Sequence, residues 1–321
     1  MRQYLVAFLL SFVVASTTSG QEYSNKEGNA AVASIVSLIR AKYVFPSKGD
    51  QIADKYNKAW KSGQFKDIRD WKTFAERSTQ ILQEVIEDGH MYVNFDPGTS
   101  ATLKAPVQDS ETQTEDQFFH GADARQRNFG FRKVEVLEGN IGYILLSEIN
   151  ISVKSLSVLH STMNFIANTD TLIIDLRHNH GGGSEIGAVL ETYFFSKPTS
   201  FLEFRSRDGK TEISKTVNWL TDQRYLKPLF IITDRGTASA AEAFAFSLQA
   251  TRRAKIVGER SAGAAHMNSW YFINNEIFLS VSTAAPTLPG TESNWERKGV
   301  QPDIAIDSTS DLNSILARIR R

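Results

Sequence analysis

The segment LFIITDRGTASAAEAFAFSL, residues 229–248, is the most informative part of the sequence about the fold class. Its first four residues form an unbroken apolar run that continues into Thr233, which is typical of a strand covered on both faces of a sheet. A polar turn follows at 234–237, and alanines and phenylalanines then recur at helical spacing up to Leu248. The segment therefore predicts a strand, a turn and a helix, the repeating unit of an α/β protein.

Similar units lie on both sides of this segment. The pattern predicts strands at 141–146, 171–176 and 255–258, a helix after Ser184, a helix over 155–168 and a closing helix over 312–319. Residues 29–86 instead show only helical spacing, and they predict three helices before a strand at 91–95. We expect a signal peptide at 1–20, a helical N-terminal domain at 21–95, a linker at 96–128 and an α/β core at 129–321.

Composition excludes several classes of protein. The chain has 321 residues, with 36 Lys plus Arg and 36 Asp plus Glu, so its formal net charge is zero. A chain with balanced charge lacks the excess of basic residues that is typical of proteins that bind nucleic acid. The chain has no cysteine, which excludes disulfides, iron–sulfur clusters and cysteine nucleophiles.

The first 20 residues have the pattern of an export signal. Arg2 precedes an apolar run, and small residues follow at 16–20. The run is shorter than the roughly 20 residues of a comfortable membrane span, although an uncleaved anchor is the alternative. We therefore expect a secreted or periplasmic protein with no membrane partner after cleavage.

The predicted strand at 171–176 leads into three consecutive glycines, 181–183. Glycines permit unusual backbone dihedrals and expose N–H groups, which can stabilise a phosphate or a transient oxyanion. The sequence has neither the Walker pattern nor a dinucleotide fingerprint here, so phosphate is the weaker interpretation. A simple glycine turn is the alternative.

The second strand-to-helix corner places Ser239 at the start of a helix. A serine there commonly serves only as the N-cap. The flanking alanines leave room around the hydroxyl, however, and the N–H of Ala240 could face an oxyanion formed on its target. A serine nucleophile needs a base, and the sequence has neither a Ser-x-x-Lys pair nor a Gly-x-Ser-x-Gly elbow.

The base must then come from elsewhere in the chain. Of the six histidines, His90 follows an Asp-Gly turn and His266 lies in a glycine–alanine loop. His178 and His180 could form a metal pair, because alternate residues share a face, but no third ligand is evident.

Five motifs in order resemble the C-terminal-processing (tail-specific) serine peptidase family, in the branch with the tricorn protease core and the interphotoreceptor retinoid-binding protein. The motifs are Asp88-Gly89-His90, Leu172 to Arg177 with Gly181 to Gly183, Thr237 to Glu242, Val257 to Gly263, and Trp295 to Asp303. The resemblance implies an α/β fold, a ClpP/crotonase-like ββα spiral core behind a small helical N-terminal domain.

The resemblance also implies roles for particular residues. Ser239 matches the nucleophile, His90 the general base and Glu296 the acidic residue of the relay. Gly182 or Gly183, together with Ala240, match the oxyanion hole. The sequence departs from the family at two positions, since Gly89 replaces a serine and Ala264 stands where one branch has a lysine. For His90 the alternative is a turn residue, and for Glu296 a surface carboxylate.

Three functions follow from these assignments. The leading hypothesis is an exported serine endopeptidase that cleaves peptides or unfolded proteins through an acyl-enzyme, with no metal or other cofactor. The second is a non-catalytic carrier of a hydrophobic small molecule on the same fold. The third, an acyl-thioester enzyme, rests on fold analogy alone.

Overall fold

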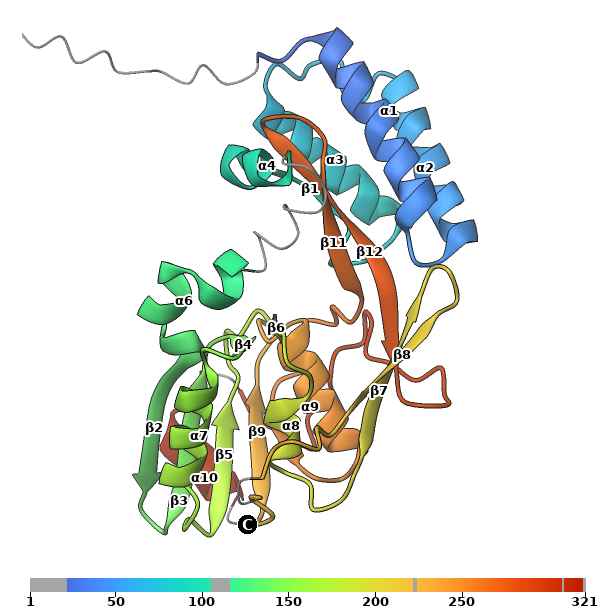
Figure 1. Cartoon of the computed structure of the whole chain (residues 1–321). Helices are drawn as coiled ribbons and strands as arrows, with labels where there is room; N and C mark the ends of the chain where they lie inside the picture. Colours follow the sequence, from blue (N-terminus) through green and yellow to red (C-terminus); the bar gives the residue numbers. More distant parts are fainter. Residues whose placement is uncertain (1–21, 105–115, 222–223, 308, 320–321) are drawn as a thin grey trace, which may run out of the picture.

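The computed structural model describes residues 22–104, 116–221, 224–307 and 309–319. The expected signal peptide at 1–20 therefore lies outside the described residues. The described chain begins with three helices, α1 (Asn25–Lys42), α2 (Pro46–Lys61) and α3 (Trp71–Val85), which lie together at one end of the molecule (Figure 1). Ser24 and Asp70 cap α1 and α3 with their side chains, and the three predicted helices are confirmed.

The helices rest on a five-stranded sheet. Strand β1 (Tyr92–Phe95) pairs antiparallel with β12 (Ile277–Thr287), which also pairs with β11 (Met267–Phe272) and β7 (Ser200–Ser206). Strand β8 (Thr211–Lys215) pairs with β7 and forms one end of the sheet. Apolar side chains of the helices and of β12 share one core, which attaches the helical region to the rest of the chain.

The second sheet has six strands in the order β13-β10-β9-β5-β3-β2. They are β2 (Phe131–Leu137), β3 (Ile141–Leu146), β5 (Thr171–Asp175), β9 (Leu229–Thr233), β10 (Lys255–Gly258) and β13 (Ile304–Ala305). All pairs are parallel except that of β2 with β3.

Helices cover both faces of this sheet, so its central strands β3, β5 and β9 are mostly apolar. Buried side chains of α7 (Leu156–Phe165) and α9 (Ala240–Ala250) pack on one face, and those of α10 (Leu312–Ile319) on the other. The α/β architecture behind a helical N-terminal region is confirmed, as are the predicted strand at 229–233 and the closing helix.

The chain after the three glycines differs from the prediction. Residues Gly182–Ser184 form strand β6, which pairs in parallel with β4 (Ile149–Ile151), and only Val189–Thr192 form a helix, α8. The long helix expected from Ser184 is therefore wrong. Two glycines with positive φ, Gly182 and Gly187, hold the intervening backbone outside the helical region.

The stretch predicted as a linker, 96–128, contains short helices where it is described. Helix α4 (Pro97–Leu103) is capped by Asp96, and α6 (Ala122–Gln126) leads into a 3₁₀ turn, Asn128–Gly130. No helix within the described ranges is both long enough and apolar enough to cross a membrane.

Candidate active site

The two strand-to-helix corners meet at the carboxyl ends of the neighbouring strands β5 and β9. The N–H of Ala238 donates to the carbonyl of Asn179 over 2.9 Å and joins the corners directly. A Cβ added to Gly181 would lie 2.7 Å from the Cβ of Ser239, so only glycine permits this approach. Clefts at the carboxyl ends of parallel strands are the usual position of sites in α/β sheets.

Ser239 has a backbone conformation that L-residues rarely adopt. Its φ is 55° and its ψ is −123°, immediately before the first residue of α9. Such strain persists only where the surroundings enforce it, and it is typical of functional sites. A strained serine between a strand and a helix is also how hydrolases expose a nucleophilic hydroxyl above a sheet.

The buried carboxylate of Glu242 holds this corner in place. Its Oε2 accepts from the backbone N–H groups of Ser239 (3.0 Å) and Ala264 (2.9 Å). Its Oε1 accepts from the Ser261 hydroxyl (2.5 Å) and the Gly263 N–H (2.7 Å). Burial raises the pKa of Glu242, and these four hydrogen bonds oppose that shift. One carboxylate thus connects the serine with the loop over 261–264.

Two backbone N–H groups near Ser239 are candidates for binding an oxyanion. Ala240 is the first residue of α9, where N–H groups have no partner within the helix. In the parallel ladder of β4 and β6, Ile149 is paired with Gly182, and the N–H of Ile149 donates to the carbonyl of Gly181. In such a ladder, the carbonyl of Ile149 accepts from the N–H of Gly183. Of the two predicted glycines, Gly182 is therefore the one whose N–H points away from β4.

Ser239 opens into a cavity of about 820 Å³. Apolar and small side chains form much of its wall, and strand β8 borders it along consecutive residues. The residues that line it include Gly182, Gly183, Ala188, Glu191, Leu202, Phe204, Val217, Trp219, Ser239, Ala240, Ala243, His266 and Trp295. The serine and one imidazole therefore share a space large enough for a peptide segment or a small ligand.

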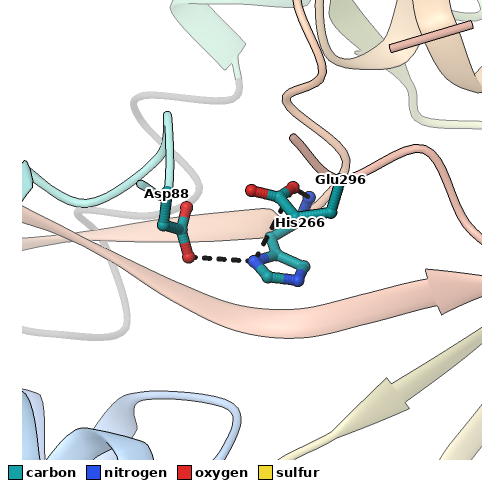
Figure 2. A group of neighbouring side chains, drawn as sticks. All are labelled: Asp88, His266 and Glu296. Carbon is teal, nitrogen blue, oxygen red and sulfur yellow. Dashed lines mark hydrogen bonds and ion pairs between the residues drawn. The ribbon is translucent and has the colours of Figure 1, made fainter. Parts of the chain in front are cut away.

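The imidazole in this cavity belongs to His266, and Figure 2 shows it between two carboxylates. Its Nδ1 lies 2.9 Å from Oδ2 of Asp88 and 3.8 Å from Oε2 of Glu296. Glu296 also accepts from the backbone N–H of His266 over 3.2 Å. A carboxylate on Nδ1 fixes the ring and its tautomer, which leaves Nε2 as the nitrogen available to a hydroxyl.

The charges of this cluster shift all three groups. Burial alone would lower the pKa of His266, but the hydrogen bond to Asp88 and the charges of Asp88 and Glu296 raise it overall. Burial would raise the pKa of Asp88, yet its bonds to His266 and other donors lower it. Burial raises the pKa of Glu296, and the proximity of Asp88 adds to that shift.

The same three side chains are the one group of potential metal ligands within the described part of the chain, with donor atoms within 4.8 Å of one another. Each oxygen of Asp88 already accepts two hydrogen bonds. Oδ1 accepts from the His90 N–H and the Ser282 hydroxyl, and Oδ2 from the Tyr43 hydroxyl and His266. Because its lone pairs are occupied, the cluster is better suited to orienting an imidazole than to binding a cation.

His90, the base that the sequence favoured, occupies a different environment. Its N–H donates to Asp88 and its carbonyl accepts from Ser280, so its backbone is fixed within the turn. The Nδ1 of its ring is buried without a hydrogen-bond partner in the described structure, and the ring is not among the groups that line the cavity. The pKa of His90 is lowered, mainly because the ring is buried away from water.

The remaining candidates are also placed. Glu296 is not an exposed carboxylate, since it accepts from the Ala265 N–H over 2.7 Å and faces His266 rather than His90. His178 pairs with Asp234 and His180 bonds the Gly236 carbonyl, so the two rings have separate partners. The contact between Asp88 and His266 is not predicted from the sequence, because no local spacing connects residues so far apart.

A strained serine that shares a cavity with a carboxylate-oriented imidazole has the arrangement used in nucleophilic catalysis. Comparison with known proteins agrees with a site of that kind. Residues 140–306 match peptidase family S41, and residues 25–137 match the N-terminal domain of peptidase S41 in eukaryotic IRBP. The chain belongs to peptidase family S41, which confirms the resemblance to the C-terminal-processing peptidases.

Individual relatives are distant. A carboxyl-terminal-processing protease of Synechocystis sp. is 28% identical over 171 residues, which cover 52% of this chain but only 38% of that protein. A putative peptidase from Parabacteroides merdae has a similar structure, with a TM-score of 0.59 at 16% identity over 91% of this chain and 92% of that one. The photosystem II D1 C-terminal processing protease has a TM-score of 0.56 at 16% identity, over 92% of this chain and 97% of that one.

Proposed function

We propose that this protein is a serine endopeptidase in which Ser239 is the nucleophile and His266 its general base. The observation that carries the proposal is the shared cavity, whose wall contains both the strained Ser239 and an imidazole whose Nδ1 is held by Asp88. Membership of peptidase family S41 supports the same reaction class.

The proposed reaction follows the chemistry of acyl transfer. Nε2 of His266 takes the proton of the Ser239 hydroxyl as the oxygen attacks the scissile carbonyl. The N–H groups of Gly182 and Ala240 stabilise the tetrahedral oxyanion, and the protonated imidazole then donates its proton to the leaving amine. Water hydrolyses the acyl-enzyme by the same route. Asp88 and Glu296 stabilise the imidazolium that forms in both stages.

The substrate class follows from the wall of the cavity. Strand β8 ends its sheet, and its consecutive residues border the cavity that contains Ser239. An extended peptide can add to such an edge through main-chain hydrogen bonds. We therefore propose peptides or unfolded protein segments as substrates, cleaved outside the cytoplasm after export directed by residues 1–20.

A carrier of hydrophobic small molecules remains the second candidate. The observation in its favour is the apolar part of the cavity wall, which includes Leu202, Phe204 and Trp219. A carrier role does not explain why a serine with strained dihedrals and an oriented imidazole line the same cavity, and the peptidase proposal does.

A fluorophosphonate probe tests the proposal, because it reacts with an activated serine and not with an ordinary one. We expect labelling of the native protein at Ser239, none of Ser239→Ala, and strong loss in His266→Gln. Ser293→Ala, which changes an exposed loop serine, is the matched control. Equal labelling of native protein and Ser239→Ala, or no labelling of a folded native protein, contradicts the proposal.

A further inference from the structure

One carboxylate in the cavity has no role in the proposed reaction. Glu191 lies on the one-turn helix α8 and lines the same cavity as Ser239 and His266. Within the described residues, its half-buried side chain makes no hydrogen bond or ion pair with another side chain. Burial raises the pKa of Glu191 to about 7, as expected for a carboxylate withdrawn from water without a cation beside it.

The position of Glu191 is fixed by contacts around α8. The Thr192 hydroxyl donates to the Ala188 carbonyl and accepts from the Val217 N–H, which ties α8 to the cavity wall. Just beyond α8, the rings of Phe194 and Phe244 lie 6.0 Å apart and pack the segment against α9. These contacts fix the backbone segment that carries Glu191.

Small residues form part of the wall of the cavity that this carboxylate and Ser239 line. Gly187, Ala188, Ala240 and Ala243 all line the cavity, and the two alanines of α9 are three residues apart on one face of that helix. Larger apolar side chains, among them Trp295, complete the wall. The space is thus suited to a side chain with an apolar stem and a cationic tip.

We propose that Glu191 determines the specificity of this peptidase by binding the lysine or arginine side chain of the residue whose carbonyl is attacked. The assignment to that residue rests on the proposed function, because Gly182 and Ala240, the proposed oxyanion donors, line the same cavity. A half-buried carboxylate without a partner gains a charge-assisted hydrogen bond from a basic side chain, and arginine can form two. The other charged residues on the cavity wall, Glu212 and Lys215, are exposed on β8.

Paired peptides test the proposal. They differ only in arginine or norleucine before the scissile bond, and kcat/KM is measured for both. We expect the native protein to prefer arginine by at least about tenfold, and Glu191→Gln to lose that preference. Glu76→Gln, the same change on the exposed face of α3, should retain the native ratio. A native ratio near one, an unchanged ratio in Glu191→Gln, or its loss in Glu212→Gln instead overturns the proposal.

A second measurement separates this proposal from the proposed function. Butylguanidinium and butanol are titrated into Ser239→Ala, whose cavity keeps Glu191, and binding is followed by NMR shifts of the Ala243 and Ala188 amides. We expect butylguanidinium alone to shift them, and not in Ser239→Ala combined with Glu191→Gln. Such binding together with absent fluorophosphonate labelling would refute the peptidase and retain the cation site. Absent binding in a protein that is labelled at Ser239 would refute only the role of Glu191.

Discussion

Oδ2 of Asp88 lies 2.9 Å from Nδ1 of His266, although the two residues are 178 positions apart in the chain. Asp88 comes from the turn that precedes β1, and His266 from the loop that precedes β11. The pairing of β1 and β11 with β12 brings these segments together. The relay of the proposed active site therefore depends on the sheet that joins the helical region to the remainder of the protein.

The first prediction compares the two histidines by the same substitution. His266→Gln removes an imidazole that lines the cavity and is oriented by Asp88, so we expect peptide hydrolysis to fall by about 10³-fold or more. His90→Gln should cost less than about tenfold, because its ring is not part of the cavity wall. Steady-state kinetics of both variants, with circular dichroism to confirm folding, measures the difference. The reverse order would assign the base to His90.

The second prediction concerns pH. The pKa of His266 is raised above its ordinary value of 6.5, and only the neutral ring can accept a proton. Activity should therefore rise with pH and reach half its maximum above pH 6.5. Asp88→Asn removes the hydrogen bond and the charge that oppose the effect of burial, so this midpoint should move to lower pH.

The same variant should also be slower, by about 10²- to 10⁴-fold, because an amide can hold the wrong tautomer of the ring. The pH profile of kcat/KM for native protein and Asp88→Asn gives both quantities. A slow variant with an unchanged midpoint would show that Asp88 has only a structural role.

The third prediction concerns Glu242, whose two oxygens each accept two hydrogen bonds. In Glu242→Gln, either orientation of the amide places its NH₂ group against donors. We expect a loss of about 2–4 kcal/mol in the free energy of unfolding and reduced labelling of Ser239 by the fluorophosphonate. Urea denaturation measures the first effect. Glu76→Gln is the control, and a Glu242→Gln protein of native stability would contradict the argument.

The fourth prediction tests the backbone of the proposed oxyanion site. A Cβ at Gly182 would lie 2.0 Å from the Ile149 carbonyl oxygen, and its φ is +125°. We expect Gly182→Ala to destabilise the protein by about 3 kcal/mol or more and to abolish hydrolysis.

Gly209→Ala is the matched control for that variant. Gly209 also has a positive φ, +79°, but a Cβ there would meet nothing within 4 Å. Its cost should be limited to about 1–2 kcal/mol from the backbone, with activity retained. Equal destabilisation of the two variants would show that the close approach of Gly182 to Ile149 is not important.

Local patterns in the sequence were sufficient for most of the parallel sheet. The strand at 229–233 has the predicted bounds, because an apolar run between turn residues permits few other structures. The helix expected after Ser184 failed although Ile186, Val189 and Leu190 have helical spacing. Flanking glycines and the pairing of β6 with β4 determined that segment, and neither is visible in periodicity.

For the same reason, only part of the candidate site could be predicted from the sequence. Ser239 and Ala240 could be chosen because a strand-to-helix corner is a local feature. The base proposed for the serine could not be chosen, since Asp88 and His266 meet only through strand pairing between distant segments. The resemblance to a family directed attention to His90, whose neighbour Asp88 is the residue that contacts the cavity histidine.

The attachment of the helical region to β12 has a consequence for biosynthesis. A ribosome completes Asp88 first and Ser239 later, and the strands β11 and β12 that hold His266 against Asp88 are synthesised after Ser239. A nascent chain therefore contains Ser239 before the imidazole of His266 can be oriented by Asp88. Under the proposed mechanism, the nascent chain cannot hydrolyse a peptide during that interval.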